Sequence, residues 1–182
     1  MTDSAPTVPD SAAGHDLIGA ALPALALPAS DGCLVDLGAL GPGRTVIYLY
    51  PLTGRPGVPQ PAGFEGYPGA RGCTAESRDF RDHYTDLRNA GISRIFGLSG
   101  QDSSYQQEVV ERLRLPFVLL SDSAFRLADD LGLPTFVVDG GLRFHTRTTL
   151  IVHANHVEHV FSPVEAPEAH AQQVLDWVRS HL

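Results

Sequence analysis

A run of six β-branched, aromatic and aliphatic residues, 45–50, lies in the first third of the chain and ends at Pro51. Half-exposed strands alternate apolar and polar residues, so an unbroken apolar run is typical of a strand that is buried on both faces. Pro51 ends such a strand because proline has no backbone N–H to donate. Since a strand of this kind needs helices or other elements on both sides of its sheet, the run predicts an α/β fold.

The rest of the chain alternates between strand and helix patterns. Turn residues at 30–32 predict an early hairpin. Helices are expected at 73–89, 102–113, 123–131 and 166–182, and strands at 92–99, 117–120 and 135–138, with a late hairpin of 148–152 and 156–161. This order predicts a three-layer α/β sandwich with a mixed central sheet.

The length of 182 residues suits one domain. Residues 1–16 are acidic and rich in Ala, Ser and Pro, which predicts a flexible N-terminal tail before a single domain of residues 17–182. Within that domain, residues 54–69 contain nine Gly or Pro in sixteen positions and form a predicted loop. The loop either covers a functional site, with Phe64 and Tyr67 as an apolar wall, or is a tolerated surface insertion.

Charge and composition exclude several functions. The net charge of −8 disfavours nucleic acid and anionic lipid as partners. All thirteen basic residues are Arg, so chemistry that needs a lysine, such as a Schiff base, is absent. Prolines interrupt the apolar stretch 17–29, which is too short to span a membrane and lacks the charged flank of a signal peptide. We therefore expect a cytoplasmic protein without a membrane segment.

The two cysteines, Cys33 and Cys73, are too few for a disulfide scaffold or a four-cysteine zinc site. Cys73 follows Gly72 at the predicted start of a helix, where unpaired N–H groups and the helix dipole stabilise a thiolate. This position predicts a lowered pKa and a reactive thiol. The alternative is that Cys73 is a small buried hydrophobic residue.

Several segments resemble the peroxiredoxin family, most closely its bacterioferritin-comigratory or Q-type branch. In chain order they are Ile18–Pro23 with Leu27-Pro28 and Asp31-Gly32, then Tyr48–Pro51, Gly72–Thr74 with Phe80–Asp82, Leu119–Asp122 and Arg147–Val152. The resemblance runs from about Ile18 to Leu182. It implies a thioredoxin-like fold and the reduction of hydrogen peroxide or organic hydroperoxides by a cysteine. Separately, no glycine-rich fingerprint follows a strand and opens a helix, so we expect no cofactor.

The resemblance also implies roles for individual residues. Cys73 corresponds to the peroxidatic nucleophile, which becomes a sulfenic acid. Arg147 corresponds to the arginine that stabilises the thiolate and polarises the peroxide. The family's threonine three residues before the cysteine is Ala70 here. Thr53 is the predicted substitute for its hydroxyl, and Thr74 is a weaker candidate.

The sequence leaves two routes open for reduction of the sulfenic acid, because Q-type members often carry a second cysteine five residues after the first. That position is Arg78, and Cys33 is the other thiol. We expect a one-cysteine mechanism in which thioredoxin, glutaredoxin or a small-molecule thiol is the reductant. The alternative is that Cys33 resolves Cys73. Arg71 and Arg78 flank Cys73; they either add positive potential or, as is commoner for such residues, are exposed arginines on a helix face. The protein is expected to be a monomer or homodimer.

Two hypotheses from other classes compete with a peroxidase. One is a cysteine hydrolase that pairs Cys73 with His145 or His153. The other is a catalytically silent thioredoxin-like module. A metal site is disfavoured because the four nearby histidines (His145, His153, His156 and His159) have no accompanying ligand pattern and are expected to be outward-facing residues of the late hairpin. Asp129-Asp130 is expected on a solvated helix face.

Overall fold

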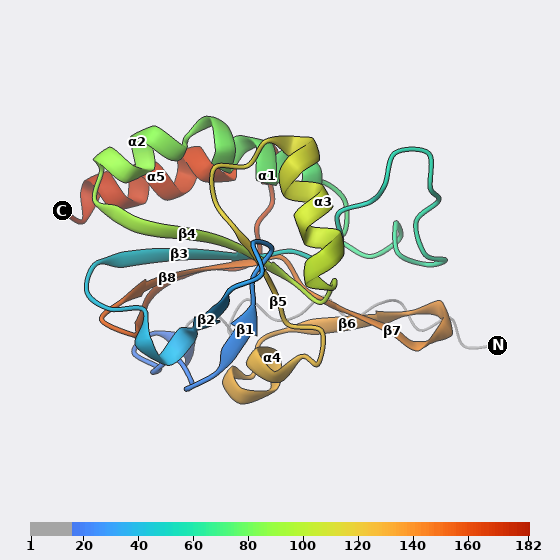
Figure 1. The fold of residues 1–182 in the computed structure, drawn as a ribbon, viewed down its shortest axis with the longest axis horizontal. Helices are drawn as coiled ribbons and strands as arrows, with labels where there is room; N and C mark the ends of the chain where they lie inside the picture. Colours follow the sequence, from blue (N-terminus) through green and yellow to red (C-terminus); the bar gives the residue numbers. More distant parts are fainter. Residues whose placement is uncertain (1–15) are drawn as a thin grey trace.

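A five-stranded mixed sheet lies at the centre of the computed structural model, which describes residues 16–182 (Figure 1). Its strand order is β5 (Leu119–Ser121), β4 (Ile92–Ser99), β3 (Arg44–Leu49), β8 (Thr148–His153) and β9 (His156–Phe161). β3, β4 and β5 are parallel, whereas β8 and β9 run antiparallel to their neighbours. The apolar run 45–50 falls on β3 at the middle of the sheet, and its residues are buried, as predicted.

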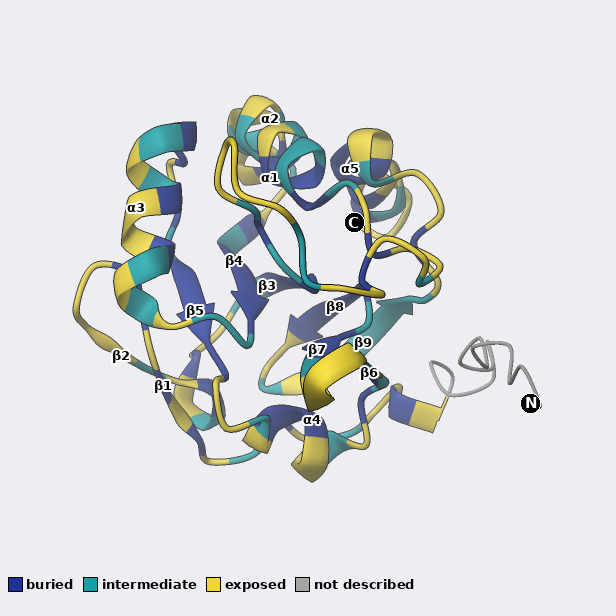
Figure 2. Ribbon diagram, turned by 90° about the vertical axis from the view of Figure 1, so that its right-hand side faces the viewer, coloured by how far each residue is buried: buried dark blue, intermediate teal, exposed yellow. Residues whose placement is uncertain are grey.

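Both faces of the sheet are covered, which confirms the predicted three layers. One face carries α1 (Cys73–Asp82), α2 (Tyr84–Asn89), α3 (Ser103–Leu113) and α5 (His170–Ser180). The other carries α4 (Arg126–Leu131) and the hairpin of β1 (Ala26–Pro28) and β2 (Leu34–Asp36), with the short 3-10 helix η2 (Leu37–Ala39). Figure 2 shows the strands between these layers as the most buried part of the molecule.

Some predicted elements differ in extent from the observed ones. The segment expected to be one helix, 73–89, is divided at His83 into α1 and α2. At this break, His83 Nδ1 lies 2.9 Å from the Asp79 carbonyl oxygen. The last helix begins at His170, after the 3-10 helix η4 (Pro167–Ala169). Residues 135–138 form β6 (Thr135–Val138) as predicted, but this strand lies outside the central sheet. It pairs with β7 (Leu142–His145), which the sequence analysis missed, across the 3-10 turn η3 (Asp139–Gly141).

The Gly/Pro-rich segment forms a loop of turns, as expected, because residues 51–72 contain no helix or strand. Two aromatic residues attach it to the β6–β7 hairpin: Tyr67 stacks on Phe136 with ring centroids 3.7 Å apart, and Phe64 meets Phe144 at 5.1 Å. Phe64 is buried in this cluster. The loop is therefore anchored near its C-terminal end, directly before α1.

The described residues bear on two further expectations. The tail predicted at 1–16 lies outside them except for Asp16, so it stays a prediction. Among residues 16–182, no helix combines the length and the apolar character that crossing a bilayer requires.

Candidate active site

Cys73 is the first residue of α1 and lies at the wall of a small pocket. Its N-cap, Gly72, has a φ of 102°, which turns the chain sharply into the helix. The cysteine is only 3% exposed. A pocket of about 360 Å³ opens onto it, lined also by Leu52, Phe64, Thr74 and other residues of the loop and helix. The thiol is thus shielded from bulk solvent but open to a small molecule.

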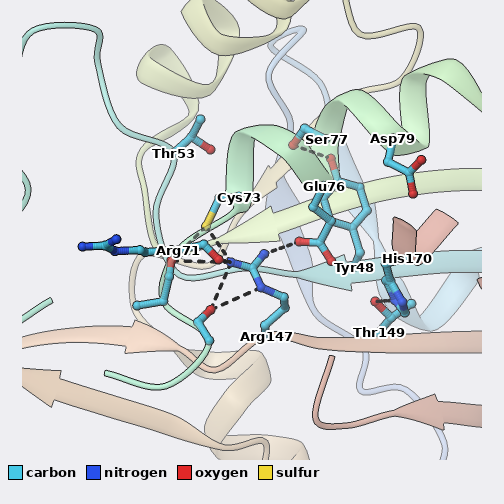
Figure 3. Close-up of polar contacts among 12 residues, drawn as sticks. Tyr48, Thr53, Arg71, Cys73, Glu76, Ser77, Asp79, Arg147, Thr149 and His170 are labelled. Carbon is cyan, nitrogen blue, oxygen red and sulfur yellow. Dashed lines mark hydrogen bonds and ion pairs between the residues drawn. The ribbon is translucent and has the colours of Figure 1, made fainter. Parts of the chain in front are cut away.

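Arg147 contacts the sulfur directly. Its Nη2 lies 3.1 Å from Cys73 Sγ, and the side chain is 2% exposed. The same nitrogen donates to the carbonyl oxygens of Gly69 at 3.1 Å and of Arg71 at 3.0 Å (Figure 3). Because these carbonyl groups belong to the end of the Gly/Pro-rich loop, the loop holds the guanidinium of Arg147 against the first turn of α1.

Glu76 completes a buried cluster that the sequence analysis did not anticipate. It lies on α1 three residues after Cys73, and its carboxylate accepts a hydrogen bond from Arg147 Nη1. Burial raises the pKa of Glu76 from 4.5 to about 7, although Arg147 opposes this shift. The spacing was an available signal, because residues i and i+3 lie on the same face of a helix.

The pKa of Cys73 departs from the sequence-based expectation. Burial raises the pKa of the thiol above its ordinary value, and Glu76 raises it further, whereas Arg147 and the Leu52 N–H lower it. The prediction of a lowered pKa considered only the helix N-terminus and a nearby arginine. It is wrong because burial disfavours the charged thiolate by more than these groups favour it.

Thr53 lies next to the pocket that holds the sulfur but does not line it; it lines a neighbouring cavity of about 620 Å³, together with Gln101 and Tyr105. It is fully buried, and its two neighbours, Leu52 and Gly54, both line the pocket that holds Cys73. Its hydroxyl approaches the Tyr50 hydroxyl but makes no hydrogen bond of normal geometry with any described residue. Figure 3 shows Thr53 beside the start of α1, where Cys73 lies. A buried hydroxyl of this kind is available to a ligand in the pocket.

The structure separates Cys33 from Cys73. Cys33 is exposed and directly precedes β2, whose hairpin packs on the face of the sheet opposite α1. The hairpin joins the central sheet at its β5 edge, where Ala29 bridges Leu120, whereas Cys73 lies at the start of α1 on the other face. A disulfide needs Cα atoms within ~7 Å of each other.

The flanking arginines differ from Arg147 in that both are exposed. Arg71 pairs with Glu65 at 2.8 Å, which offsets its charge, and Arg78 lines the mouth of the pocket. Of the positive groups expected around Cys73, the one in contact with the sulfur is therefore Arg147.

The histidines do not form a catalytic pair with Cys73. His145 is fully buried, so its predicted outward orientation is wrong; its Nε2 lies 3.2 Å from Asp122 Oδ2, because the pairing of β7 with β6 turns it inward. His153 and His156 are exposed. Among residues 16–182, no group of three His, Cys, Asp or Glu side chains is placed to hold a metal ion. Asp129 is exposed and pairs with Arg143, and Asp130 is exposed, as expected.

The turn at Gly72 gives a stability prediction. A Cβ at Gly72 would lie 2.5 Å from Pro167 Cγ, whereas a Cβ at Gly69, which also has a positive φ, meets no atom within 4 Å. Since both sites carry similar backbone strain, the difference isolates the overlap. Gly72→Ala is expected to lower the free energy of unfolding by about 2 kcal/mol more than Gly69→Ala, as measured by urea denaturation. If both variants lose the same free energy of unfolding, Pro167 moves away from the new Cβ at no cost.

Comparison with known proteins identifies the family. The sequence model of the Redoxin family matches residues 17–175. Peroxiredoxin Q of Suaeda salsa, a chloroplastic protein, is 30% identical over 163 residues, which cover 89% of this chain and 67% of that protein. Peroxiredoxin Bcp of Escherichia coli is 26% identical over 162 residues, covering 87% of this chain and 93% of the relative. The chain thus spans about two thirds of the chloroplastic relative and nearly all of the bacterial one.

Solved structures agree with the family and the fold. The crystal structure of peroxidoxin BcpB from Mycobacterium tuberculosis superposes with a TM-score of 0.71 at 25% identity, covering 90% of this chain and 96% of that one. A cysteine-to-serine mutant of PrxQ from Xylella fastidiosa, 19% identical over the same shares of the two chains, has the same fold with a TM-score of 0.72. The resemblance and the thioredoxin-like fold predicted from the sequence motifs are confirmed. The chain belongs to the Redoxin family and, within it, is a thiol-dependent peroxidase of the peroxiredoxin Q/Bcp branch that uses a peroxidatic cysteine.

Proposed function

We propose that Cys73 is the peroxidatic cysteine and that Arg147 and Thr53 act with it on a hydroperoxide bound in the pocket. The observation that supports this assignment most directly is the 3.1 Å contact between Arg147 Nη2 and Cys73 Sγ at the pocket wall. A fixed guanidinium in a site of low dielectric stabilises negative charge on sulfur and on the peroxide oxygens much more than it would in water.

The reaction breaks one O–O bond and forms one S–O bond. The sulfur of Cys73 attacks the terminal oxygen of the hydroperoxide, which is transferred to sulfur as a sulfenic acid while the other oxygen departs. The thiol proton ends on the departing oxygen, giving water from hydrogen peroxide or an alcohol from an organic hydroperoxide. Burial raises the pKa of Cys73 and so disfavours the thiolate, whereas Arg147 lowers the cost of ionising the thiol during the reaction.

In this mechanism, Thr53 provides the hydroxyl that the sequence lacks at Ala70. Its side chain is fully buried beside the pocket and forms no normal hydrogen bond with a described residue. A hydroxyl both donates and accepts, so it can hold the peroxide by one oxygen while accepting the proton of the other. Thr74 is a weaker candidate because it is only half-buried, although, unlike Thr53, it lines the pocket.

For the return step we propose a one-cysteine mechanism. An external thiol attacks the sulfenic sulfur and releases water, and a second thiol then reduces the mixed disulfide. The support is the placement of Cys33 directly before β2, in a hairpin that packs on the face of the sheet opposite α1. Thioredoxin, glutaredoxin and a small-molecule thiol are the candidate reductants, and the protein is a monomer or homodimer in this proposal. Its two free thiols suit the reducing cytoplasm.

Trapping of the sulfenic acid tests this assignment. After one equivalent of hydrogen peroxide in the presence of dimedone, mass spectrometry of the wild-type protein and of Cys33→Ser is expected to show the adduct on Cys73. Peroxide consumption with dithiothreitol should be equal in these two proteins and absent in Cys73→Ser. An adduct confined to Cys33, or turnover by Cys73→Ser, would contradict the assignment. A Cys33–Cys73 disulfide would overturn only the one-cysteine step.

A further inference from the structure

The backbone of Thr53 is held by two side chains from another part of the fold, Gln101 and Tyr105. Its N–H donates to Gln101 Oε1 at 3.0 Å, and its carbonyl oxygen accepts from Gln101 Nε2 at 3.1 Å. The Tyr105 hydroxyl donates to the same carbonyl oxygen at 2.7 Å. We propose that Gln101, assisted by Tyr105, is a positioning residue that sets the place of the Thr53 hydroxyl in the peroxide site. This inference rests on the proposed role of Thr53.

The local backbone does not by itself hold the Thr53 hydroxyl at a constant position relative to Cys73. Thr53 lies twenty residues before Cys73, and residues 51–72 form no helix or strand. The position of a hydroxyl on the turn next to the cysteine is fixed by the backbone of that turn. A hydroxyl on a long loop moves with the loop, so its position relative to the cysteine varies. A second attachment is therefore required if the distance from Thr53 to the sulfur is to be constant.

Gln101 is suited to provide that attachment because its own backbone is fixed. It lies between the end of β4 and the start of α3. Its carbonyl oxygen accepts from Ser121 Oγ at 2.7 Å, and its N–H donates to Ser99 Oγ at 3.3 Å. Both serines lie at the C-terminal ends of central strands. The two hydrogen bonds from Gln101 to Thr53 thus hold the start of the loop at a fixed position relative to the central strands.

Residues 54 and 55 of the loop make further contacts with side chains of α3. Arg112 donates to the Gly54 carbonyl oxygen at 3.1 Å, and Arg55 lies over the Tyr105 ring at 4.8 Å. Arg55 also pairs with Glu108 at 2.8 Å, where both side chains are about half exposed. The exposed ion pair contributes little. The buried end of the attachment, at Thr53, is held by Gln101 and Tyr105.

The amide of Gln101 suits this task because it both donates and accepts. Gln101→Met keeps the length of the side chain and removes both bonds to Thr53. Gln101→Glu keeps the acceptor for the Thr53 N–H, and Tyr105 still donates to the Thr53 carbonyl oxygen. A displacement of about 1 Å at a reacting group costs up to ~10²-fold in rate. We therefore expect Gln101→Met to react with peroxide some tenfold to hundredfold more slowly, and Gln101→Glu to lose less.

The experiment measures two reactions of the same sulfur. Stopped-flow fluorescence gives the second-order rate constant with hydrogen peroxide, and iodoacetamide gives the rate of alkylation, which needs the thiolate but no peroxide-binding hydroxyl. Each is measured in wild type, Gln101→Met and Gln101→Glu, and for Gln101→Met also in a Thr53→Val background. The matched control is Gln107→Met, at an exposed glutamine of α3 that contacts Glu111. Thermal unfolding checks that all variants fold.

The proposal predicts that Gln101→Met slows the peroxide reaction, leaves alkylation unchanged and has no further effect once Thr53 is Val. Gln107→Met should match wild type in both reactions. A wild-type peroxide rate in Gln101→Met would overturn the proposal, as would an equal loss in both backgrounds or a parallel loss of alkylation, since these indicate damage to the fold. If Thr53→Val itself reacts at the wild-type rate, the proposed role of Thr53 fails instead.

Discussion

The Arg147→Gln variant is expected to reduce hydrogen peroxide about 10³-fold more slowly than the wild-type protein, because one side chain supplies both the contact to sulfur and the positive charge of the site. The guanidinium lies 3.1 Å from Cys73 Sγ and is 2% exposed, so bulk water cannot replace it. The substitution also leaves the buried Glu76 carboxylate without its partner. The measurement is the second-order rate constant of the reduced protein, followed by stopped-flow fluorescence.

Two further arginine variants make this result specific. Arg143→Gln replaces an arginine on β7, the strand that precedes Arg147 in the chain. Arg143 pairs with Asp129 outside the pocket, so this variant should keep the wild-type rate. Arg147→Lys keeps the charge but loses the planar set of donors that reaches the Gly69 and Arg71 carbonyl oxygens together, so we expect an intermediate rate. A wild-type rate in Arg147→Gln would remove Arg147 from the mechanism.

The second large effect concerns stability and pH, and it arises from Glu76. Burial raises the pKa of this carboxyl from 4.5 to about 7 in the folded protein. As the pH rises from 4.5 to 7, the unfolded chain therefore loses the Glu76 proton before the folded protein does. The stabilisation by Glu76 is complete below pH 4.5 and is lost as the pH rises through 7. The loss is about 3 kcal/mol, from 1.36 kcal/mol per unit of pKa.

The appropriate measurement is the difference in unfolding free energy between wild type and Glu76→Gln, by urea denaturation from pH 4 to pH 8. Burial lowers the pKa of His170 to about 4, which destabilises the protein as the pH falls, but this contribution is common to both proteins and cancels. The unfolding free energy of the wild type should fall relative to that of Glu76→Gln as the pH rises. Glu111→Gln, at an exposed position of α3, should give a flat difference. A flat difference for Glu76→Gln as well would contradict the raised pKa.

The features that the sequence predicted well are those that depend on local pattern or motif order. Burial of 45–50 follows from its unbroken apolar character, and the order of motifs indicated the family. The motifs also indicated Cys73 and Arg147 as a pair, and the structure brings the two together. Their roles, with that of Thr53, stay predictions until the variants are measured.

The features that the sequence did not predict depend on contacts between distant segments. β7 has four residues like β6, but its sequence, Leu142 to His145, lacks the β-branched residues of β6, and it is defined by its pairing with β6 across two glycines. His145 is buried because of that pairing. The raised pKa of Cys73 reflects its burial, and Gln101 hydrogen-bonds a residue 48 positions away. None of these follows from local residue spacing.

The near-complete enclosure of the sulfur has a consequence for catalytic turnover. A hydroperoxide is small enough to enter a space of about 360 Å³, but a folded redox partner is not. Cys73 is 3% exposed, so the thiol of such a partner reaches its sulfur only if the loop or the first turn of α1, which together line the pocket, moves outward. The frequency of that movement would limit how fast a protein donor regenerates the enzyme, while a small thiol would use the substrate's own entrance.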